Sequence, residues 1–280
     1  MSVSAKERGE LASVRLRRDE SDVVDAPETL AIVVPVLNER VRLPQLLEAL
    51  IRVQHELAHC RVLVKTVFVD GGSDDGSHEW LQERASALKG SSDMAPIGHP
   101  ADARMIVCTS AAGRAIQQRQ GVSQANTDFF LFLHADTVLP VNFASEWQAF
   151  RASGRCWGFF VVRLSGSAWP FRLIEWMMSW RSRLTAIATG DQAVFVSKTL
   201  YDSVGGMPDL PLMEDVVLCK RCKRFGRPWV SDYPVVTSSR RWERRGVCRT
   251  VVLMWCIRAC FWLGVPARKL ADWYRPKQKA

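Results

Sequence analysis

The sequence predicts an α/β protein with a mostly parallel central sheet and helices on both faces of that sheet. Two observations predict this class. Short apolar runs alternate with segments of helical spacing over the first half of the 280-residue chain, which favours parallel strands joined by right-handed crossovers. Polar residues also gather directly after the apolar runs, at the strand ends where such sheets bind ligands.

The first half of the chain supplies four strands and three helices in alternation. Each expected strand is a continuous apolar run, as in a parallel sheet that is covered on both faces. The expected strands are residues 30–36, 62–69, 105–108 and 129–133, and the expected helices are residues 43–53, 79–88 and 111–124. A segment rich in Gly, Ser and Pro over residues 90–101 is expected to be a loop.

The second half has a different pattern. We expect strands over residues 157–164 and 193–196, a Trp- and Met-rich stretch with interleaved arginines over 169–184, a helix over 213–225 and a final apolar helix over 247–263. Residues 1–28 mix charges with no apolar run and are expected to be a disordered leader. The expected organisation is one α/β domain over 29–245 and an apolar, basic helical extension over 246–280.

Composition limits the partners and the compartment. Hydrophobic residues make up 48% of the chain and charged residues 24%, which is typical of a globular protein. The net charge of +9 suits an anionic partner, such as nucleic acid, acidic lipid or a phosphorylated substrate. No nucleic-acid-binding motif accompanies this charge, so no nucleic-acid partner is expected. The eight scattered cysteines favour free thiols in a reducing compartment.

No stretch reaches the roughly 18 uncharged apolar residues of a spanning helix. The final helix nevertheless combines Trp255 and Trp262 with Arg258, which suits either a membrane interface or packing on the domain. The stretch with Trp176 and Trp180 allows the same alternatives, or it could line an acceptor site. We expect a cytoplasmic protein with peripheral contact to the inner face of the plasma membrane.

Three acidic positions could carry chemistry. Asp136 follows a strand and could bind Mg²⁺ or Mn²⁺ that bridges to a diphosphate, or it could cap a turn. Glu214 and Asp215 open a helix, where the dipole favours carboxylates, and either could serve as a general base for a hydroxyl. Asp70 opens a Gly-Gly turn and could accept a hydrogen bond from a nucleobase, or simply hold that turn.

Four segments, in order and spacing, resemble the family-2 glycosyltransferases, which have the GT-A fold. They are Pro35-Val36-Leu37-Asn38-Glu39, Val69-Asp70-Gly71-Gly72-Ser73-Asp74-Asp75-Gly76-Ser77, Phe132-Leu133-His134-Ala135-Asp136-Thr137 and Glu214-Asp215. Three shorter matches support them: Gly113-Arg114-Ala115, Gly190-Asp191-Gln192 and Ser239-Arg240-Arg241-Trp242. The resemblance covers about residues 30–245 and points to a bacterial subgroup associated with arsenosugar biosynthesis and carotenoid-type glycosyltransferases.

The resemblance implies an inverting, metal-dependent hexosyltransferase that uses a nucleotide-sugar donor, a divalent cation and a hydroxyl acceptor, which would be apolar or lipid-linked. Asp215 would be the general base, with Glu214 beside it. Asp136 and His134 would hold the metal. The donor nucleotide would contact Pro35, Asn38, Glu39, Asp70, Gly113, Arg114 and Ala135, the diphosphate Arg241 and Trp242, and the acceptor Gly190, Asp191 and Gln192.

The chain departs from the family pattern twice. The usual Asp-x-Asp is His134-Ala135-Asp136, so one carboxylate is lost and His134 could be a ligand or a hydrogen-bond partner. The usual Asp-Asp-Gly-Ser is Asp70-Gly71-Gly72-Ser73. The lost carboxylate leaves a catalytically inactive nucleotide-sugar-binding protein as an alternative, with a nucleic-acid-binding protein less favoured. A nucleotidyltransferase would need a Gly-rich, Lys-containing phosphate loop, which the sequence lacks.

Overall fold

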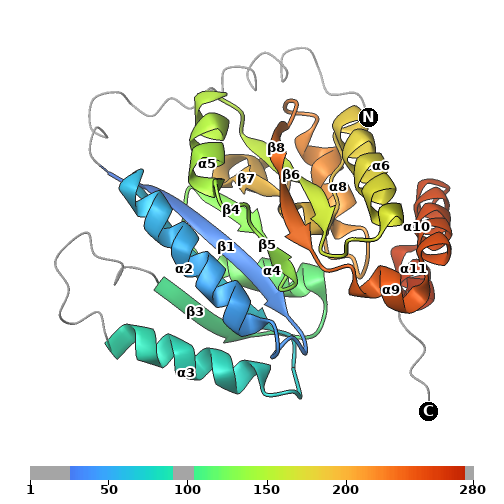
Figure 1. Ribbon diagram of the computed structural model, residues 1–280. Helices are drawn as coiled ribbons and strands as arrows, with labels where there is room; N and C mark the ends of the chain where they lie inside the picture. The colour runs from blue at the N-terminus through green and yellow to red at the C-terminus, as the bar shows by residue number, and fades with distance from the viewer. Residues whose placement is uncertain (1–25, 91–103, 275–280) are drawn as a thin grey trace.

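The computed structural model describes residues 26–90 and 104–274. Residues 1–25 of the leader expected over 1–28 lie outside these ranges. Residues 91–101 of the loop expected over 90–101 also lie outside them. Within the described part of the chain, one central sheet is covered by helices on both faces (Figure 1), which confirms the predicted α/β class.

The described strands form a single sheet in the order β3-β2-β1-β4-β7-β6-β8-β5. Strands β1 to β4 pair in parallel, as predicted for the first half of the chain. The second half adds antiparallel pairs between β4 and β7, β6 and β7, and β5 and β8, with β6 and β8 parallel. The bounds are β1 Glu28–Val36, β2 Val62–Asp70, β3 Arg104–Thr109, β4 Phe129–Phe132, β5 Thr137–Val138, β6 Trp157–Leu164, β7 Phe195–Ser197 and β8 Trp229–Thr237.

The helices of the first half lie between these strands as expected, with different ends. They are α2 Leu43–His59, α3 Ser77–Gly90 and α4 Arg114–Ser123. Helix α2 runs six residues past the predicted end, because Leu57 continues its buried face and is fully buried. Helix α4 begins at Arg114 rather than at residue 111, because Gly113 has a φ of 148°, which ordinary side chains rarely adopt.

Several elements of the second half were not predicted. They are β5, β8, α5 Phe143–Ala152, α7 Lys198–Ser203, α9 Arg240–Arg245 and α11 Ala267–Tyr274. Strand β8 contains Asp232 and Pro234. These residue types are uncommon within strands, so the sequence pattern does not indicate a strand there. Helix α5 has the period expected of a helix, since Phe143, Trp147 and Phe150 share its buried face.

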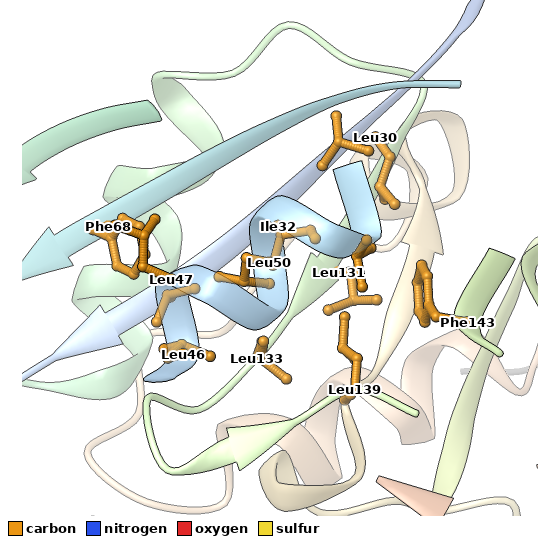
Figure 2. Close-up of a cluster of buried hydrophobic side chains, with 14 of the residues drawn as sticks. Leu30, Ile32, Leu46, Leu47, Leu50, Phe68, Leu131, Leu133, Leu139 and Phe143 are labelled. Atoms are coloured by element: carbon orange, nitrogen blue, oxygen red, sulfur yellow. The ribbon is translucent and has the colours of Figure 1, made fainter. Parts of the chain in front are cut away.

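Two hydrophobic clusters cover the two faces of the sheet. Alternate residues of β1 divide between them: Ile32 packs toward α2, whereas Val33 packs toward the opposite face. Figure 2 shows the first cluster, in which Leu46 and Leu50 of α2 meet side chains of β1, β2 and β4. These clusters fix the sheet and therefore the loops at the carboxyl ends of its strands.

The last described helices pack on the domain. Helix α10 (Val247–Trp262) contacts α6 (Trp169–Thr185) through Val247 and Val251, which join the cluster around Phe171 and Ile174. The two helices lie near one another at the edge of the molecule (Figure 1). Packing, one of the two roles predicted for the final helix, is therefore observed. Among the described residues, no helix has the length and apolar content needed to cross a bilayer.

Candidate active site

A cavity of about 1350 Å³ opens at the carboxyl ends of β1 and β4, between α6, α10 and α8 (Glu214–Cys222). The structure brings nearly all the predicted site residues to its walls. Those that line it are Pro35, Asn38, Glu39, Gly113, Arg114, His134, Ala135, Asp136, Gly190, Asp191, Glu214, Asp215, Arg241 and Trp242. Asp70 and Gln192 lie outside this lining and have a different role in the structure.

Asp70 holds its own turn. Its Oδ2 accepts hydrogen bonds from the backbone N–H groups of Gly72 at 2.9 Å and Ser73 at 3.0 Å, and its Oδ1 accepts one from the Ser73 hydroxyl. The side chain is 2% exposed. The turn role considered for Asp70 is therefore observed, and its contact with a nucleobase stays a prediction.

The loop after β2 in turn holds the loop after β1. The Asn38 N–H donates to Ser73 Oγ at 2.9 Å, and the Asp74 N–H donates to Asn38 Oδ1 at 3.0 Å. The Glu39 N–H donates to Ser77 Oγ at 3.2 Å. Two segments that are distant in sequence thus satisfy one another's backbone groups, which fixes Asn38 and Glu39 at the edge of the cavity.

Gln117 is a site residue that sequence reasoning missed. From α4, its Nε2 donates to the carbonyl oxygens of Val36 and Val69, both at 2.8 Å, and so ties the ends of β1 and β2 together. A Cβ at position 71 would stand 2.9 Å from this Nε2. A larger residue at position 71, where the family pattern has an acid, would therefore require the Gln117 amide to move.

Two other carboxylates, those of Glu39 and Asp191, act on Asp136. Burial raises the pKa of Asp136, the charges of Glu39 and Asp191 raise it further, and Arg42 and Arg240 oppose them. Glu39 forms ion pairs with Arg42 at 2.6 Å and with Arg240 at 3.0 Å. The pair with Arg240 links the end of β1 to the start of α9, so Glu39 is held by arginines from two parts of the chain.

The carboxylate oxygens at Asp136 are ligands that suit a hard divalent cation. Asp191 Oδ1 is buried and has no hydrogen-bond partner among the described residues, which suits an oxygen aimed at a cation. No group of three potential ligand side chains assembles within residues 26–90 and 104–274. Magnesium and manganese are commonly held by one or two carboxylates together with substrate phosphates, so two carboxylates suffice.

His134 packs directly against the turn that carries Gly190. A Cβ at position 190 would meet His134 Nε2 at 2.5 Å, so any other residue there would require the ring or the turn to shift. Burial holds the pKa of His134 well below its usual value, and the charges of Arg114 and Arg241 lower it further. The ring is therefore neutral at physiological pH. Its Nε2 is buried without a partner among the described residues, and both predicted roles, metal ligand and hydrogen-bond partner, need such an atom.

Asp215 stands at the first turn of α8 with the properties of a general base. Its Oδ2 accepts from the Gly190 N–H at 2.6 Å, and its Oδ1 accepts from the Val216 N–H at 2.7 Å. Burial and then the neighbouring charge of Glu214 raise the pKa of Asp215 to about 7, against a lowering by Arg114. Glu214 itself lies 3.7 Å from Arg114. A carboxyl that titrates near neutrality is suited to accept a proton in catalysis.

Gln192 holds the turn Gly190–Gln192 in place through buried hydrogen bonds. It is fully buried, and its Oε1 accepts from Ser182 Oγ of α6 at 2.8 Å and from the Thr189 N–H at 3.1 Å. Its Nε2 donates to the Phe160 carbonyl at 3.1 Å. Gln192 therefore connects α6, β6 and the turn Gly190–Gln192, so that Asp191 rather than Gln192 faces the cavity.

Two arginines in the cavity wall were also missed as site residues. Arg181 of α6 and Arg258 of α10 both line the cavity. Burial lowers the pKa of Arg181, and the charges of Asp191 and Asp215 act against that lowering. The sequence feature that could have indicated them is a basic residue within an apolar segment that contains tryptophan.

The chain is similar to known proteins in sequence family and in fold. The family model described as "Glycosyl transferase family 2" matches residues 31–195. No curated protein matches the chain. The solved structure of Staphylococcus aureus TarS 1-349 is similar at a TM-score of 0.54 and 15% identity, covering 76% of this chain and 60% of that one.

A second similar structure is the mannosyltransferase PcManGT from Pyrobaculum calidifontis, in complex with GDP-Man and Mn²⁺. Its TM-score is 0.57 at 18% identity, covering 85% of this chain and 62% of that one. At such identities the likeness shows a shared fold. The present chain spans about three fifths of the length of either protein.

Proposed function

The chain belongs to glycosyl transferase family 2, and from this membership we propose that it transfers a hexose from a nucleotide-diphosphate donor to a hydroxyl acceptor with inversion at the anomeric carbon. The acceptor oxygen forms a bond to that carbon as the bond from the carbon to the diphosphate oxygen breaks. The electron pair leaves with the diphosphate, and the hydroxyl proton passes to Asp215. A single displacement from the opposite face inverts the configuration.

One observation carries this proposal: Asp215, with a pKa raised to about 7, lines the same cavity as Asp136 and Asp191. A hydroxyl is a poor nucleophile until a positioned base takes its proton. Asp215 is held by two backbone N–H groups, which orient the carboxylate while burial keeps it basic. A base and a cluster that suits a cation thus share one cavity, as displacement of a diphosphate requires.

A divalent cation, Mg²⁺ or Mn²⁺, would be held by Asp136 and Asp191, with His134 as a further candidate ligand. Such a cation supplies positive charge for the leaving diphosphate. The presence of Mn²⁺ with GDP-Man in the similar mannosyltransferase supports this part of the proposal. Arg241, whose charge acts on His134, and Trp242 would meet the same diphosphate.

The nucleotide would lie beside this cation, against the loops that follow β1, β3 and β4. There Pro35, Asn38, Glu39, Gly113, Arg114 and Ala135 line the wall. The hydrogen bonds between the loops after β1 and β2 hold Asn38 and Glu39 in place, which favours a preformed site. Asp70 would act on the nucleotide through this loop pair.

We propose an apolar or lipid-linked acceptor, bound where α6 and α10 wall the cavity. Trp176, Trp180 and Trp255 line it and are each more than half exposed, so these rings are available to an apolar ligand. Trp262 at the end of α10 is also 54% exposed. Peripheral contact with the inner face of the plasma membrane would bring such an acceptor to the cavity.

The test is release of nucleoside diphosphate from a panel of UDP-, GDP- and dTDP-sugars with Mn²⁺. We expect slow release from one donor, lost in Asp215→Asn and unchanged in Asp202→Asn, an exposed carboxylate paired with Lys198 outside the cavity. Calorimetry with the same panel measures donor binding separately. Binding without release, even with lipid extracts as a source of acceptor, would indicate an inactive binding protein. Absence of binding by every donor would refute the proposal.

A further inference from the structure

The wall of the cavity away from the nucleotide loops combines apolar side chains with the positive charges of Arg181 and Arg258. Helix α6 contributes Trp176 and Trp180, whose rings stack with centroids 6.3 Å apart. Helix α10 contributes Trp255 and Met254. A sugar and its nucleotide need no such apolar surface, so this wall is suited to a different ligand.

Arg181 lies on this wall next to Ser182, whose hydroxyl donates to Gln192 of the turn that also holds Asp215 through the Gly190 N–H. It is half-buried, and among the described residues its hydrogen-bond acceptor is Ser182 Oγ at 3.1 Å. The charges of Asp191 and Asp215 act on it, yet neither carboxylate pairs with it within 4.0 Å among the described ion pairs. A guanidinium has five N–H donors, so most of those of Arg181 are available to an anion.

Arg258 places a second positive charge on the same wall. It lies three residues after Trp255 on α10, so the two side chains share one face of the helix. Arg258 is half-buried and lines the cavity. A partly buried charge among apolar side chains is costly unless an anionic group satisfies it.

Resting on the proposed function, we propose that this wall is the acceptor subsite and that it takes an amphiphile with an acidic group, a phosphate or a carboxylate, on an apolar chain. Arg181 and Arg258 would pair with the acidic group, and the Trp and Met side chains of α6 and α10 would hold the chain. Because Arg181 and Asp215 line the same cavity, the acidic group would share that cavity with the reacting hydroxyl.

The test is calorimetric titration of the full chain with decyl phosphate and decanoate, both below their critical micelle concentrations. Saturating GDP or UDP with Mn²⁺ keeps these probes out of the diphosphate site. We expect both probes to bind, with octyl phosphate about tenfold weaker than decyl phosphate because two methylenes leave the apolar wall. A neutral decyl glucoside should bind at least tenfold more weakly than decyl phosphate.

The variants Arg181→Gln and Arg258→Gln should each lose at least tenfold in affinity for decyl phosphate and little for the glucoside. Arg183→Gln is the matched control, because Arg183 is exposed on the same helix and pairs with Asp232 outside the cavity. Donor binding by each variant verifies its fold and tests the proposed function separately.

Three results would overturn the inference while leaving the transferase intact. Binding of inorganic phosphate with the same affinity as decyl phosphate would show an anion site without an apolar wall. The glucoside could bind as tightly as decyl phosphate, which would show an apolar site without charge recognition. Equal losses in Arg183→Gln and Arg181→Gln would show a general effect of surface charge.

Discussion

The raised pKa of Asp215 makes a quantitative prediction about the dependence of rate on pH. A base acts in its deprotonated form, so kcat/KM for the donor should fall as pH drops through the pKa of about 7. With that pKa, about one tenth of Asp215 is ionised at pH 6 and about one hundredth at pH 5, so the rate should fall about tenfold per unit below neutrality. An ordinary Asp, near 4, would give a flat profile over this range.

Glu214→Gln tests the cause of that shift. The substitution removes the charge of Glu214, which is the second cause, after burial, of the raised pKa of Asp215. It also frees Arg114 from its ion pair with Glu214, and the charge of Arg114 lowers the pKa of Asp215. The acid limb of the profile should therefore move to lower pH, and at pH 6 the variant should retain a larger fraction of its plateau rate than the wild type does. Release of nucleoside diphosphate between pH 5 and 8 measures both profiles.

Glu48→Gln, which changes an exposed carboxylate on α2, provides the control for altered net charge. Tryptophan fluorescence at each pH verifies that the protein stays folded. The reasoning would be refuted by a rate that is constant from pH 5 to 8. An acid limb at the same pH in the wild type and in Glu214→Gln would refute the assigned cause.

Three further predictions concern packing, hydrogen bonding and the cation. Gly121→Ala would drive a Cβ into valine side chains of β1 and β2 and should lower the free energy of unfolding by about 1–3 kcal/mol in urea titrations, whereas Gly226→Ala, with open space around it, should change it little. Gln117→Ala removes two hydrogen bonds of 2.8 Å to strand carbonyls and should cost about 1–3 kcal/mol in the same titration. Asp136→Asn should bind GDP or UDP at least tenfold more weakly than the wild type does with Mn²⁺, and about equally with a chelator, as measured by calorimetry. An affinity equal to that of the wild type in the presence of Mn²⁺ would contradict a cation at Asp136.

Much of the site could be predicted from the sequence because its acidic residues directly follow a strand or a loop that the sequence pattern indicates. Asp136 follows an apolar strand, and Glu214-Asp215 follows a Gly- and Pro-rich loop. In a parallel sheet, strand ends such as the one before Asp136 converge on one edge. The structure also brings Glu214 and Asp215, at the start of α8, to the same cavity. The resemblance to family 2 is confirmed by the family model, while the bacterial subgroup stays a prediction.

The roles of Asp70 and Gln192 could not be separated from those of their neighbours by sequence. Both belong to matching motifs, yet Asp70 accepts hydrogen bonds from its own turn and Gln192 is buried beneath Asp191. Which side of a turn a side chain occupies depends on backbone dihedral angles that composition does not specify. The neighbours Thr189 and Ser182, which satisfy Gln192, come from two different segments.

The sequence by itself determined the class of the fold, the parallel first half of the sheet and the acidic residues at the strand ends, because periodicity and strand order are local properties of the chain. Only the tertiary structure decided what surrounds those residues. It set Gln117 between β1 and β2, paired Glu39 with Arg240 from the far end of the domain, and brought Arg181 and Arg258 to one wall. Charge, burial and hydrogen bonding act through space, and contacts between distant segments are fixed only when the core of the sheet has packed.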